Sequence, residues 1–463
     1  MRGRGPGRRT AWWWLRRCGR RAVFGVGAVR TALLPGLCAL LVLVTGAAPA
    51  SATPAGDAQA APYAFAPGAR TVAGATGTAT AARLEPGATY RSSLPRNGKL
   101  YYRLDLTAAD TAYVPVTAVP PANATVSATD GIRVSLQDAH GTPCSYSSAF
   151  SARFGAGLSP RPVTALAQRE AGKRLCQGRG TYYLLVERLD TGNPGTAPSA
   201  RWDLEIAPAT EPRPARAGAT SAPQTWNSAT PEPLGGEPRD RLGGTGFASA
   251  RPLGQGVWRT ALVPGETRFY KVPVDWGRQL HASAELAGAR GHGYVGGALN
   301  LSLYNPVRGY VEDAALGYTG VQKPAVLDPL PPVEYANRYA IPAGATAVRF
   351  AGDYYLVLHL SEQLAGTFGR GPFAVTLRVR VAGQAHAGPE YAGQPVPAGV
   401  FTVTGQDRQA AATASTGGGD GSAMKLVAIA GIGLGTVLLL VLAGWTVTAR
   451  RAQTRVNAQK PTA

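Results

Sequence analysis

The sequence predicts an all-β ectodomain of two tandem antiparallel β-sandwiches of the jelly-roll type, followed by one C-terminal transmembrane helix. Three observations predict this fold class. Apolar and polar residues alternate with a period of two in segments such as 102–106 and 375–381, so each strand has one apolar and one solvated face. Turn residues such as Asn97-Gly98 and Pro264-Gly265 separate these segments. The two halves of the ectodomain also resemble each other.

The internal repeat consists of short segments that recur in the same order. Residues 94–104 align with 262–272 at a constant offset of 168 residues. Further matched pairs are Ala82–Gly87 with Arg251–Gly256, Ser135-Leu136 with Ser302-Leu303, Gly141 with Gly309, and Tyr182-Tyr183-Leu184 with Tyr354-Tyr355-Leu356. We therefore expect two copies of one fold, sandwich 1 at 74–208 and sandwich 2 at 241–383, and no helix outside the membrane span.

Segments outside the two copies complete the predicted organisation. They are 1–52 for a signal peptide, 53–73 for a mature N-terminal segment, 209–240 for a Pro-rich linker, 384–423 for a flexible linker, 424–447 for the transmembrane helix and 448–463 for a cytoplasmic tail. The first linker is rich in Pro, Ala, Ser and Thr, and the second ends in a Gly- and Ser-rich run. Such composition without apolar periodicity is typical of linkers.

The N-terminus has the pattern of an export signal. An arginine-rich start precedes an apolar run that ends in Ala50-Ser51-Ala52, so we expect cleavage between Ala52 and Thr53. Arg20-Arg21 leaves twin-arginine export as an alternative to Sec export. A start of translation near Val29 is another alternative.

The C-terminus has the pattern of a membrane anchor. Residues 426–447 carry no charge and are long enough to cross a hydrocarbon core of about 30 Å. Basic residues follow, so the positive-inside rule predicts a single-pass protein of the cell membrane with the ectodomain outside and the tail in the cytoplasm. Gly431 and Gly435 have the GxxxG spacing that lets two helices approach, which would allow a homo-oligomer, although small residues are common in such helices.

The net charge of +20 does not predict a nucleic-acid partner. Of the 47 Lys and Arg residues, 14 lie in 1–52 and 424–463, two segments without acidic residues. The ectodomain keeps 33 basic against 27 acidic residues, and its basic residues are scattered along the chain. A nucleic-acid binder would gather them on one face.

Two of the four cysteines, Cys144 and Cys176, lie in the ectodomain. In an oxidising compartment such a pair predicts one disulfide, and two free thiols are the alternative.

The sequence contains none of the motifs that would predict an enzyme. It has no His-Glu-x-x-His, no Gly-x-Ser-x-Gly and no phosphate-binding loop, and its five histidines lack metal spacing. We therefore expect no catalytic site, no cofactor and no metal. Asp130 and Asp138 would suit calcium as an alternative to solvated turn carboxylates. Glu312-Asp313 would suit acid–base work as an alternative to plain surface charge.

An aromatic cluster is the one candidate for ligand contact. It lies between two predicted strands of sandwich 2 and consists of Tyr304, Tyr310, Tyr318, Tyr335 and Tyr339. Such tyrosines can stack on a sugar ring or anchor a protein partner, and the alternative is ordinary packing on the sheet.

Each copy resembles the bacterial pre-peptidase C-terminal type of β-sandwich. The resemblance is carried by Leu84 to Gly87, Tyr101-Tyr102, Gly141 and Tyr182-Tyr183-Leu184, with the matching set in sandwich 2. Taken whole, the chain also resembles the membrane-proximal part of actinobacterial surface proteins with a von Willebrand factor A-type domain, although that domain and its metal site are absent from this sequence. The resemblance implies a β-sandwich fold and no particular activity.

These patterns together predict a membrane-anchored extracellular binding or scaffold protein of the bacterial envelope. Its expected partners are a cell-wall polymer or another membrane or surface protein. An accessory subunit of a membrane complex is the second hypothesis, and an envelope hydrolase is the third.

Overall fold

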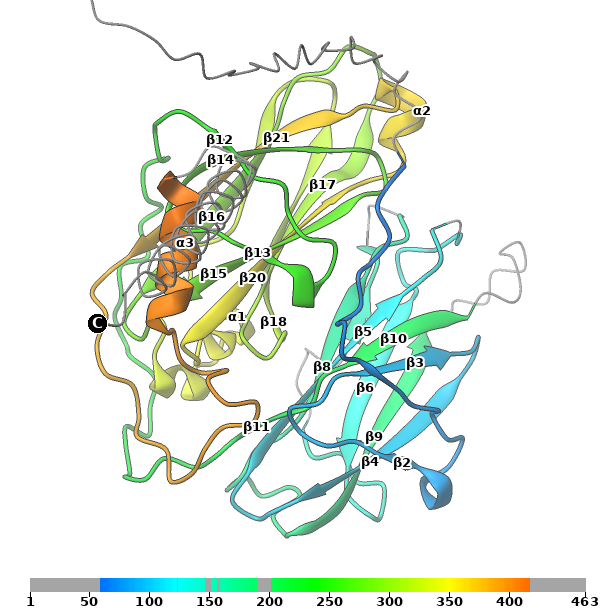
Figure 1. The fold of residues 1–463 in the computed structure, drawn as a ribbon, viewed down its shortest axis with the longest axis vertical. Coiled ribbons are helices and arrows are strands. Elements are labelled where there is room, and N and C mark those ends of the chain that lie inside the picture. The colour runs from blue at the N-terminus through cyan, green and yellow to red at the C-terminus, as the bar shows by residue number, and fades with distance from the viewer. Residues whose placement is uncertain (1–58, 123, 146–150, 156–158, 190–200, 417–463) are drawn as a thin grey trace, which may run out of the picture. The chain divides into compact units, whose positions relative to one another are not determined.

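The computed structural model describes residues 59–122, 124–145, 151–155, 159–189 and 201–416 (Figure 1). These residues belong to one compact unit that begins at Ala55. The predicted signal peptide with its cleavage site at Ala52 and Thr53, and the predicted membrane helix with Gly431 and Gly435, lie outside the described residues. Within the described ranges, no helix is long and apolar enough to cross a membrane.

Sandwich 1 consists of two sheets, which confirms the all-β class for this half. The strands are β1 (Arg70–Thr71), β2 (Ala82–Arg83), β3 (Tyr90–Leu94), β4 (Lys99–Leu106), β5 (Thr111–Val119), β6 (Gly131–Gln137), β7 (Ser151–Arg153), β8 (Val163–Arg169), β9 (Gly180–Leu189), β10 (Trp202–Ile206) and β11 (Ala209–Glu211). One sheet has the order β1-β3-β10-β5, with β8 and β11 also paired to β5. The other has the order β2-β4-β9-β6-β7.

Sandwich 2 repeats this arrangement except for β11, which has no counterpart. Its strands are β12 (Arg239–Asp240), β13 (Arg251–Pro252), β14 (Gly256–Leu262), β15 (Thr267–Val274), β16 (Gln279–Leu286), β17 (Val295–Tyr304), β18 (Tyr310–Tyr318), β19 (Lys323–Val326), β20 (Gly352–Leu360) and β21 (Phe373–Ala382). The sheet orders are β12-β14-β21-β16-β19 and β13-β15-β20-β17-β18. In each copy the eight main strands, from β3 or β14 onward, follow the strand order of a jelly roll.

The two copies also agree in register. Tyr102 pairs with Leu184 in sandwich 1, and Tyr270 pairs with Leu356 in sandwich 2. All four side chains are almost fully buried in the cores of their sandwiches. The tyrosine hydroxyls find polar partners at the core edge, because a buried hydroxyl without one would be costly: Tyr102 bonds to the Ser92 hydroxyl at 2.7 Å.

One aligned pair of the sequence analysis is wrong by a residue. Leu136 and Leu303 hold equivalent positions opposite Leu184 and Leu356, which makes Arg308 the counterpart of Gly141. Both adopt positive φ, +81° for Gly141 and +57° for Arg308. This backbone region favours glycine and disfavours a long side chain. The arginine at this turn therefore needs a compensating contact, and its guanidinium has one across the interface.

Three buried ion pairs join the two sandwiches, and each has its carboxylate in or beside sandwich 1 and its arginine in sandwich 2. Nitrogen–oxygen distances are 2.5 Å for Arg308–Glu205, 2.9 Å for Arg338–Glu211 and 3.1 Å for Arg349–Glu170. Glu205 also accepts hydrogen bonds from the Tyr63 hydroxyl and the Ala66 amide. Glu211 also accepts from the hydroxyls of Tyr113 and Tyr391. Buried carboxylates supplied with several donors can hold two bodies in one orientation.

An apolar cluster lies between these ion pairs. It brings Tyr113 and Leu166 of sandwich 1 against Val307 and Phe350 of sandwich 2, with Phe401 from the following segment. The rings of Phe350 and Phe401 are stacked with centroids 4.8 Å apart. The interface thus combines apolar burial with fixed charge pairs.

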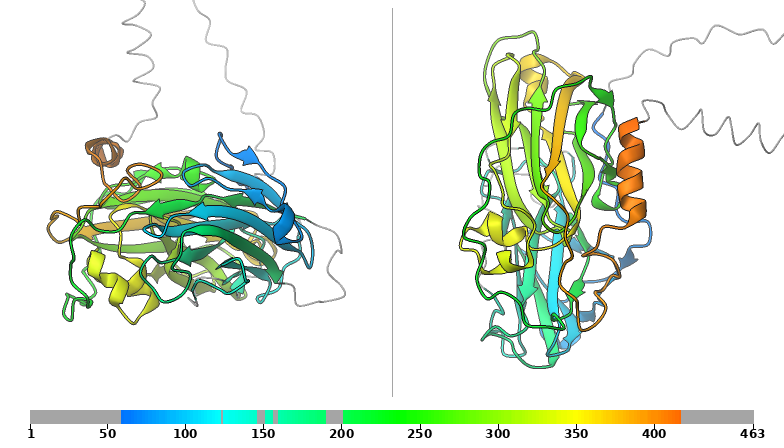
Figure 2. Two further views of the ribbon diagram at one scale, coloured as in Figure 1. Left: turned by 90° about the horizontal axis from the view of Figure 1, so that it is seen from below. Right: turned by 90° about the vertical axis from the view of Figure 1, so that its left-hand side faces the viewer.

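The two predicted linkers contact each other at two points, although most of their described side chains are exposed. Val396 forms a β-bridge with Thr210, and Tyr391 forms one with Pro214, so the two linkers pair with each other. The expectation of no helix outside the membrane span is wrong: α3 (Gly405–Thr416) lies on the outside of the sheets (Figure 2), and α1 (Ala343–Ala347) and α2 (Leu364–Phe368) are short helices. The alanines, glutamines and arginine of α3 favour a helix, and Thr404–Asp407 capping and the Arg408–Asp275 pair stabilise it.

The predicted disulfide between Cys144 and Cys176 is confirmed, with Cα atoms 5.3 Å apart. It joins the segment after β6 to the turn before β9. Since the two cysteines are 32 residues apart, the bond restricts a long excursion of the unfolded chain.

We expect Arg308→Gly to weaken the joint between the sandwiches. The variant puts glycine at this positive φ, as sandwich 1 does with Gly141, so it relieves backbone strain. It also leaves Glu205 buried without its cation. Breaking a buried pair costs about 3–5 kcal/mol, which outweighs a backbone gain of about 1 kcal/mol. Denaturant unfolding of residues 53–416 measures this loss. The exposed pair Arg259–Asp240 provides the control: Arg259→Ala should leave the midpoint nearly unchanged. Equal midpoints for Arg308→Gly and wild type would contradict the assignment.

Candidate binding cleft between the sandwiches

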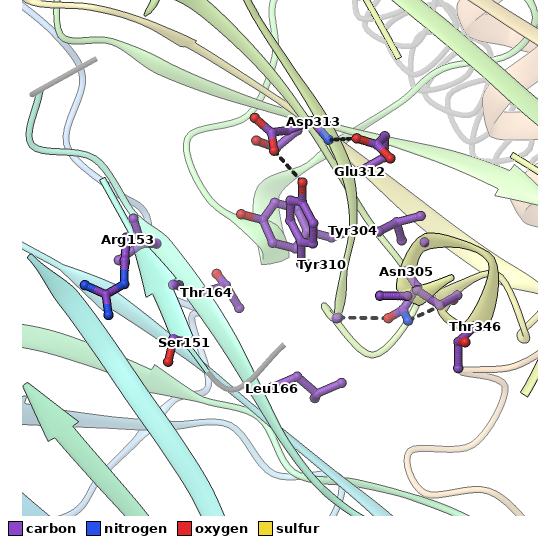
Figure 3. A pocket seen from close by; sticks show the side chains of 18 of the residues that line it. Ser151, Arg153, Thr164, Leu166, Tyr304, Asn305, Tyr310, Glu312, Asp313 and Thr346 are labelled. Carbon is purple, nitrogen blue, oxygen red and sulfur yellow. Dashed lines mark hydrogen bonds between the residues drawn. The ribbon is translucent and has the colours of Figure 1, made fainter. Parts of the chain in front are cut away.

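A cleft of about 770 Å³ lies where the two sandwiches meet. Strands β7 and β8 form one wall, and β17, β18 and α1 form the other. Figure 3 shows Tyr304, Tyr310, Glu312 and Asp313 on the wall of sandwich 2. Its other labelled side chains include Ser151, Arg153, Thr164 and Leu166 on the wall of sandwich 1. The cleft therefore exists only because the interface fixes both walls.

Two tyrosines of the predicted aromatic cluster line this cleft. Tyr304 ends β17 and Tyr310 begins β18, and their ring centroids lie 6.3 Å apart at an edge-to-face angle of 81°. Tyr310 is 41% exposed, so much of its ring is open to a ligand. Burial raises the pKa of Tyr304 to about 12, and burial together with Asp313 raises the pKa of Tyr310, so both stay neutral hydroxyls.

The carboxylates of the same wall are held in fixed positions. Asp313 accepts hydrogen bonds from the Tyr310 hydroxyl and from Asn300 Nδ2, the latter at 3.1 Å. Glu312 accepts the backbone N–H of Asp313 at 3.0 Å, and burial raises the pKa of Glu312. The two groups are neighbours on one strand and do not face each other across the cleft.

Arginines supply cationic groups to the cleft. Arg153 is exposed and donates to the Thr129 carbonyl oxygen. Arg161 is half-buried and donates to the Phe154 carbonyl oxygen, and burial lowers its pKa. Arg349 is 4% exposed and bonds Glu170 and Gln168, while its Nε has no hydrogen-bond partner among the described residues. The cleft thus offers an open aromatic face, fixed acceptors and guanidinium donors.

The other three predicted tyrosines lie elsewhere, so the sequence cluster does not gather into one site. Tyr318 is buried in the core of sandwich 2 and donates to the Ala287 carbonyl oxygen. Tyr335 lies under the Arg338 guanidinium, 3.3 Å from its ring centroid. Tyr339 is 43% exposed and is not among the residues that line the cleft.

The aspartates considered for calcium bind backbone amides in turns, and one histidine is paired with a glutamate. Asp138 accepts the backbone N–H groups of His140 and Thr142, and Asp130 accepts that of Ser127. His386 is paired with Glu334 at 2.7 Å. Among the residues that the structure describes, no group of three or more His, Cys, Asp or Glu side chains is placed to hold a metal ion.

The sequence analysis identified no strand between Cys144 and Cys176, so it missed the wall from sandwich 1. Strand β8 is buried on both faces, because the core of sandwich 1 covers one side and sandwich 2 covers the other. A strand covered on both faces shows a nearly continuous apolar run instead of alternation. The signal in the sequence is Val163–Ala167, a short run of small and apolar residues with one threonine.

Comparisons with known proteins give no family for this chain. No protein-family model matches it, and no curated protein matches it. Among solved structures, it is similar to the CUB1-EGF-CUB2 domains of human MASP-1/3, with 9% identity over 63% of this chain and 99% of that chain and a TM-score of 0.15. It is also similar to the tandem CBM22 domains of Paenibacillus barcinonensis Xyn10C, with 12% identity over 61% of this chain and 82% of that chain and a TM-score of 0.17.

A third structure is the M60 catalytic domain with two CBM51 domains from Clostridium perfringens ZmpB. It gives 10% identity over 63% of this chain, a TM-score of 0.16, and only 34% coverage of that chain. None of these overlaps carries an argument about function. The resemblance to pre-peptidase C-terminal domains stays a prediction.

His359, next to the cleft, predicts a pH dependence of stability. It is 1% exposed on β20, its Nδ1 lies 3.0 Å from the Thr267 hydroxyl, and its Nε2 has no partner among the described residues. Burial, reinforced by the nearby Arg161, holds its pKa well below the usual value near 6.5. The unfolded chain therefore binds a proton below that pH while the folded chain does not, so stability falls as pH falls.

The expected contribution is a loss of up to about 1.4 kcal/mol per pH unit below about pH 6.5, until the folded pKa is reached. Denaturant unfolding of wild type and His359→Gln between pH 7.5 and 5 measures it, and the variant should show the shallower slope. His292→Gln changes an exposed histidine and serves as the control. Parallel slopes for wild type and His359→Gln would show that His359 carries no such linkage.

Proposed function

We propose that this chain is an exported, membrane-anchored binding protein of the cell envelope and that the cleft between its sandwiches takes a saccharide of a wall polymer. The observation that carries the proposal is the composition of one rigid cleft: an open tyrosine ring, a fixed carboxylate and guanidinium groups. The apolar face of a sugar ring stacks on an aromatic side chain, and sugar hydroxyls accept from arginine and donate to carboxylates.

The fixed orientation of the two sandwiches supports ligand binding in the cleft between them. The three Glu–Arg pairs and the cluster around Phe350 fix the walls before a ligand arrives. A preformed cleft saves the ordering cost that a hinged pair of domains would incur on binding. A volume of about 770 Å³ falls in the range of small-molecule and sugar subsites.

Binding accounts for the site better than hydrolysis does. Glycoside hydrolysis needs two carboxyl groups that flank the scissile bond. Glu312 and Asp313 instead belong to the same wall, and Asp313 is already held by Tyr310 and Asn300. The opposite wall contributes Arg153 and Arg161 rather than a second acid.

An accessory role through the membrane helix is the second hypothesis from the sequence. It depends on Gly431 and Gly435, which lie outside the described residues, so the cleft favours the binding proposal.

The proposal predicts that Tyr310→Ala weakens saccharide binding about fivefold, since an aromatic contact contributes on the order of 1 kcal/mol. Residues 59–416 close their own cores, so the ectodomain 53–416 can be tested without the predicted span. Co-sedimentation with purified peptidoglycan and calorimetry with chitooligosaccharides measure binding. Tyr310→Phe, which keeps the ring, should bind nearly as wild type does.

Tyr339→Ala is the matched control, because it removes a similarly exposed tyrosine that does not line the cleft. Wild-type protein that binds neither probe, or Tyr310→Ala that binds as wild type does, would overturn the assignment of the cleft.

A further inference from the structure

One end of sandwich 2 carries a surface that the cleft does not use. It consists of three loops, 287–294, 319–323 and 366–372, which we call the tip. The loops lie side by side: the Ala289 amide donates to the Gly320 carbonyl oxygen at 2.9 Å, and the Phe368 ring contacts Tyr318 with centroids 5.1 Å apart. Figure 1 shows α2, which belongs to this tip, at one end of sandwich 2. One edge of the tip lies beside sandwich 1, because the Glu362 amide, just before α2, donates to the Ser159 hydroxyl at 3.2 Å.

The tip exposes apolar and basic side chains together. Tyr294 and Val321 are each 70% exposed, among the highest values for large apolar residues in the described chain. Arg290, Lys323 and Arg370 are exposed around them. None of the residues in the three loops is acidic. The nearby Glu285 is occupied by Gln322 and Arg378.

This combination suits the surface of a bilayer with anionic lipids. Tyrosine is enriched at the boundary between headgroups and hydrocarbon, where its ring is apolar and its hydroxyl is wet. Basic side chains are attracted to anionic headgroups within a Debye length. A protein partner would more often meet a larger apolar area than two side chains provide.

The course of the chain brings the tip toward the predicted membrane. Near the start of α3, Arg408 is paired with Asp275, which directly follows the end of β15. Further along, α3 contacts β13, and β13 pairs with the middle of β15. The tip lies at the opposite end of the sandwich, where β20 ends and β21 begins. Helix α3 therefore runs away from Asp275 and toward the tip.

Only residues 417–423 separate the end of α3 from the predicted span at 424–447. Seven residues reach at most about 25 Å. The span must therefore enter the bilayer close to sandwich 2, on the side that the end of α3 faces.

We propose that the tip of sandwich 2 docks on the anionic lipid surface from which the chain is anchored, with Tyr294 and Val321 at the headgroup level. The orientation rests on the proposed membrane anchor, whereas the affinity of the tip for lipid does not. Docking would hold this end of sandwich 2 against the bilayer.

A depth measurement on the full chain tests the orientation. Val321→Cys and Ile341→Cys, each labelled with an environment-sensitive fluorophore, are reconstituted in vesicles of phosphatidylcholine and phosphatidylglycerol. Ile341 is 98% exposed near α1 and does not belong to the tip, so it is the matched control. We expect a blue shift and quenching by brominated lipid at 321 only. Equal signals at the two positions, or no quenching at 321, would overturn the proposal.

Flotation of residues 53–416 with the same vesicles tests affinity without the anchor. Replacing Arg290, Lys323 and Arg370 by serine should lower vesicle partitioning about fivefold for each cation, or roughly 100-fold together. Replacing Arg70, Arg91 and Arg259, exposed cations outside the tip, changes net charge equally and should have a much smaller effect. An equal loss of vesicle partitioning in both triple variants would mean that only net charge matters, and it would refute the tip as the docking surface. If the proposed membrane anchor is wrong, a separate result will show it: the full-length chain will be absent from the membrane fraction of cells.

Discussion

The joint between the sandwiches depends on three carboxylates, two buried and one half-buried, that cannot be left without partners. Glu170, Glu205 and Glu211 lie in or beside sandwich 1, and sandwich 2 supplies an arginine to each. A carboxylate in a dry interface is stable only with several donors in fixed positions, so it tolerates few relative orientations of the two bodies. Apolar packing around Phe350 adds burial, but it is less directional. The cleft follows from this constraint.

The duplicated fold shows what changes when one face of a sheet becomes covered. In sandwich 1 the strand pair β4–β9 ends with Lys99 opposite Glu187, an ion pair whose lysine is exposed to solvent. The equivalent pair in sandwich 2 is Thr267 opposite His359, buried and hydrogen-bonded. The solvated charges have been replaced by a neutral pair because sandwich 1 and the N-terminal segment cover this side. A second difference between the copies is at the turn after the third long strand of this sheet. Sandwich 2 has Arg308 there, paired with Glu205 of sandwich 1, where sandwich 1 has Gly141.

Alternation and turn residues predicted the strands that have one solvated face, matched segments predicted the duplication, and the pair of cysteines predicted the disulfide. They could not predict β5 or β8, because a strand covered on both faces loses its alternation. The linkers were judged by composition, yet pairing between Thr210 and Val396 orders them, and such long-range contacts leave no local signal. The tyrosines of sandwich 2 indicated half of the cleft. Its other half comes from a strand far earlier in the chain, which only the interface brings near.

The hydrogen bond between Tyr391 and Glu211 spans 180 residues, and that between Tyr63 and Glu205 spans 142. A chain that is synthesised in order from its N-terminus presents Tyr63 and both glutamates long before Arg308 and Arg338 emerge. Sandwich 1 can close its own core during that interval, but its interface acids stay in water until the second copy arrives. Synthesis therefore imposes a waiting period on the first domain, during which its uncovered apolar face around Tyr113 and Leu166 is open to chaperones and to misassembly.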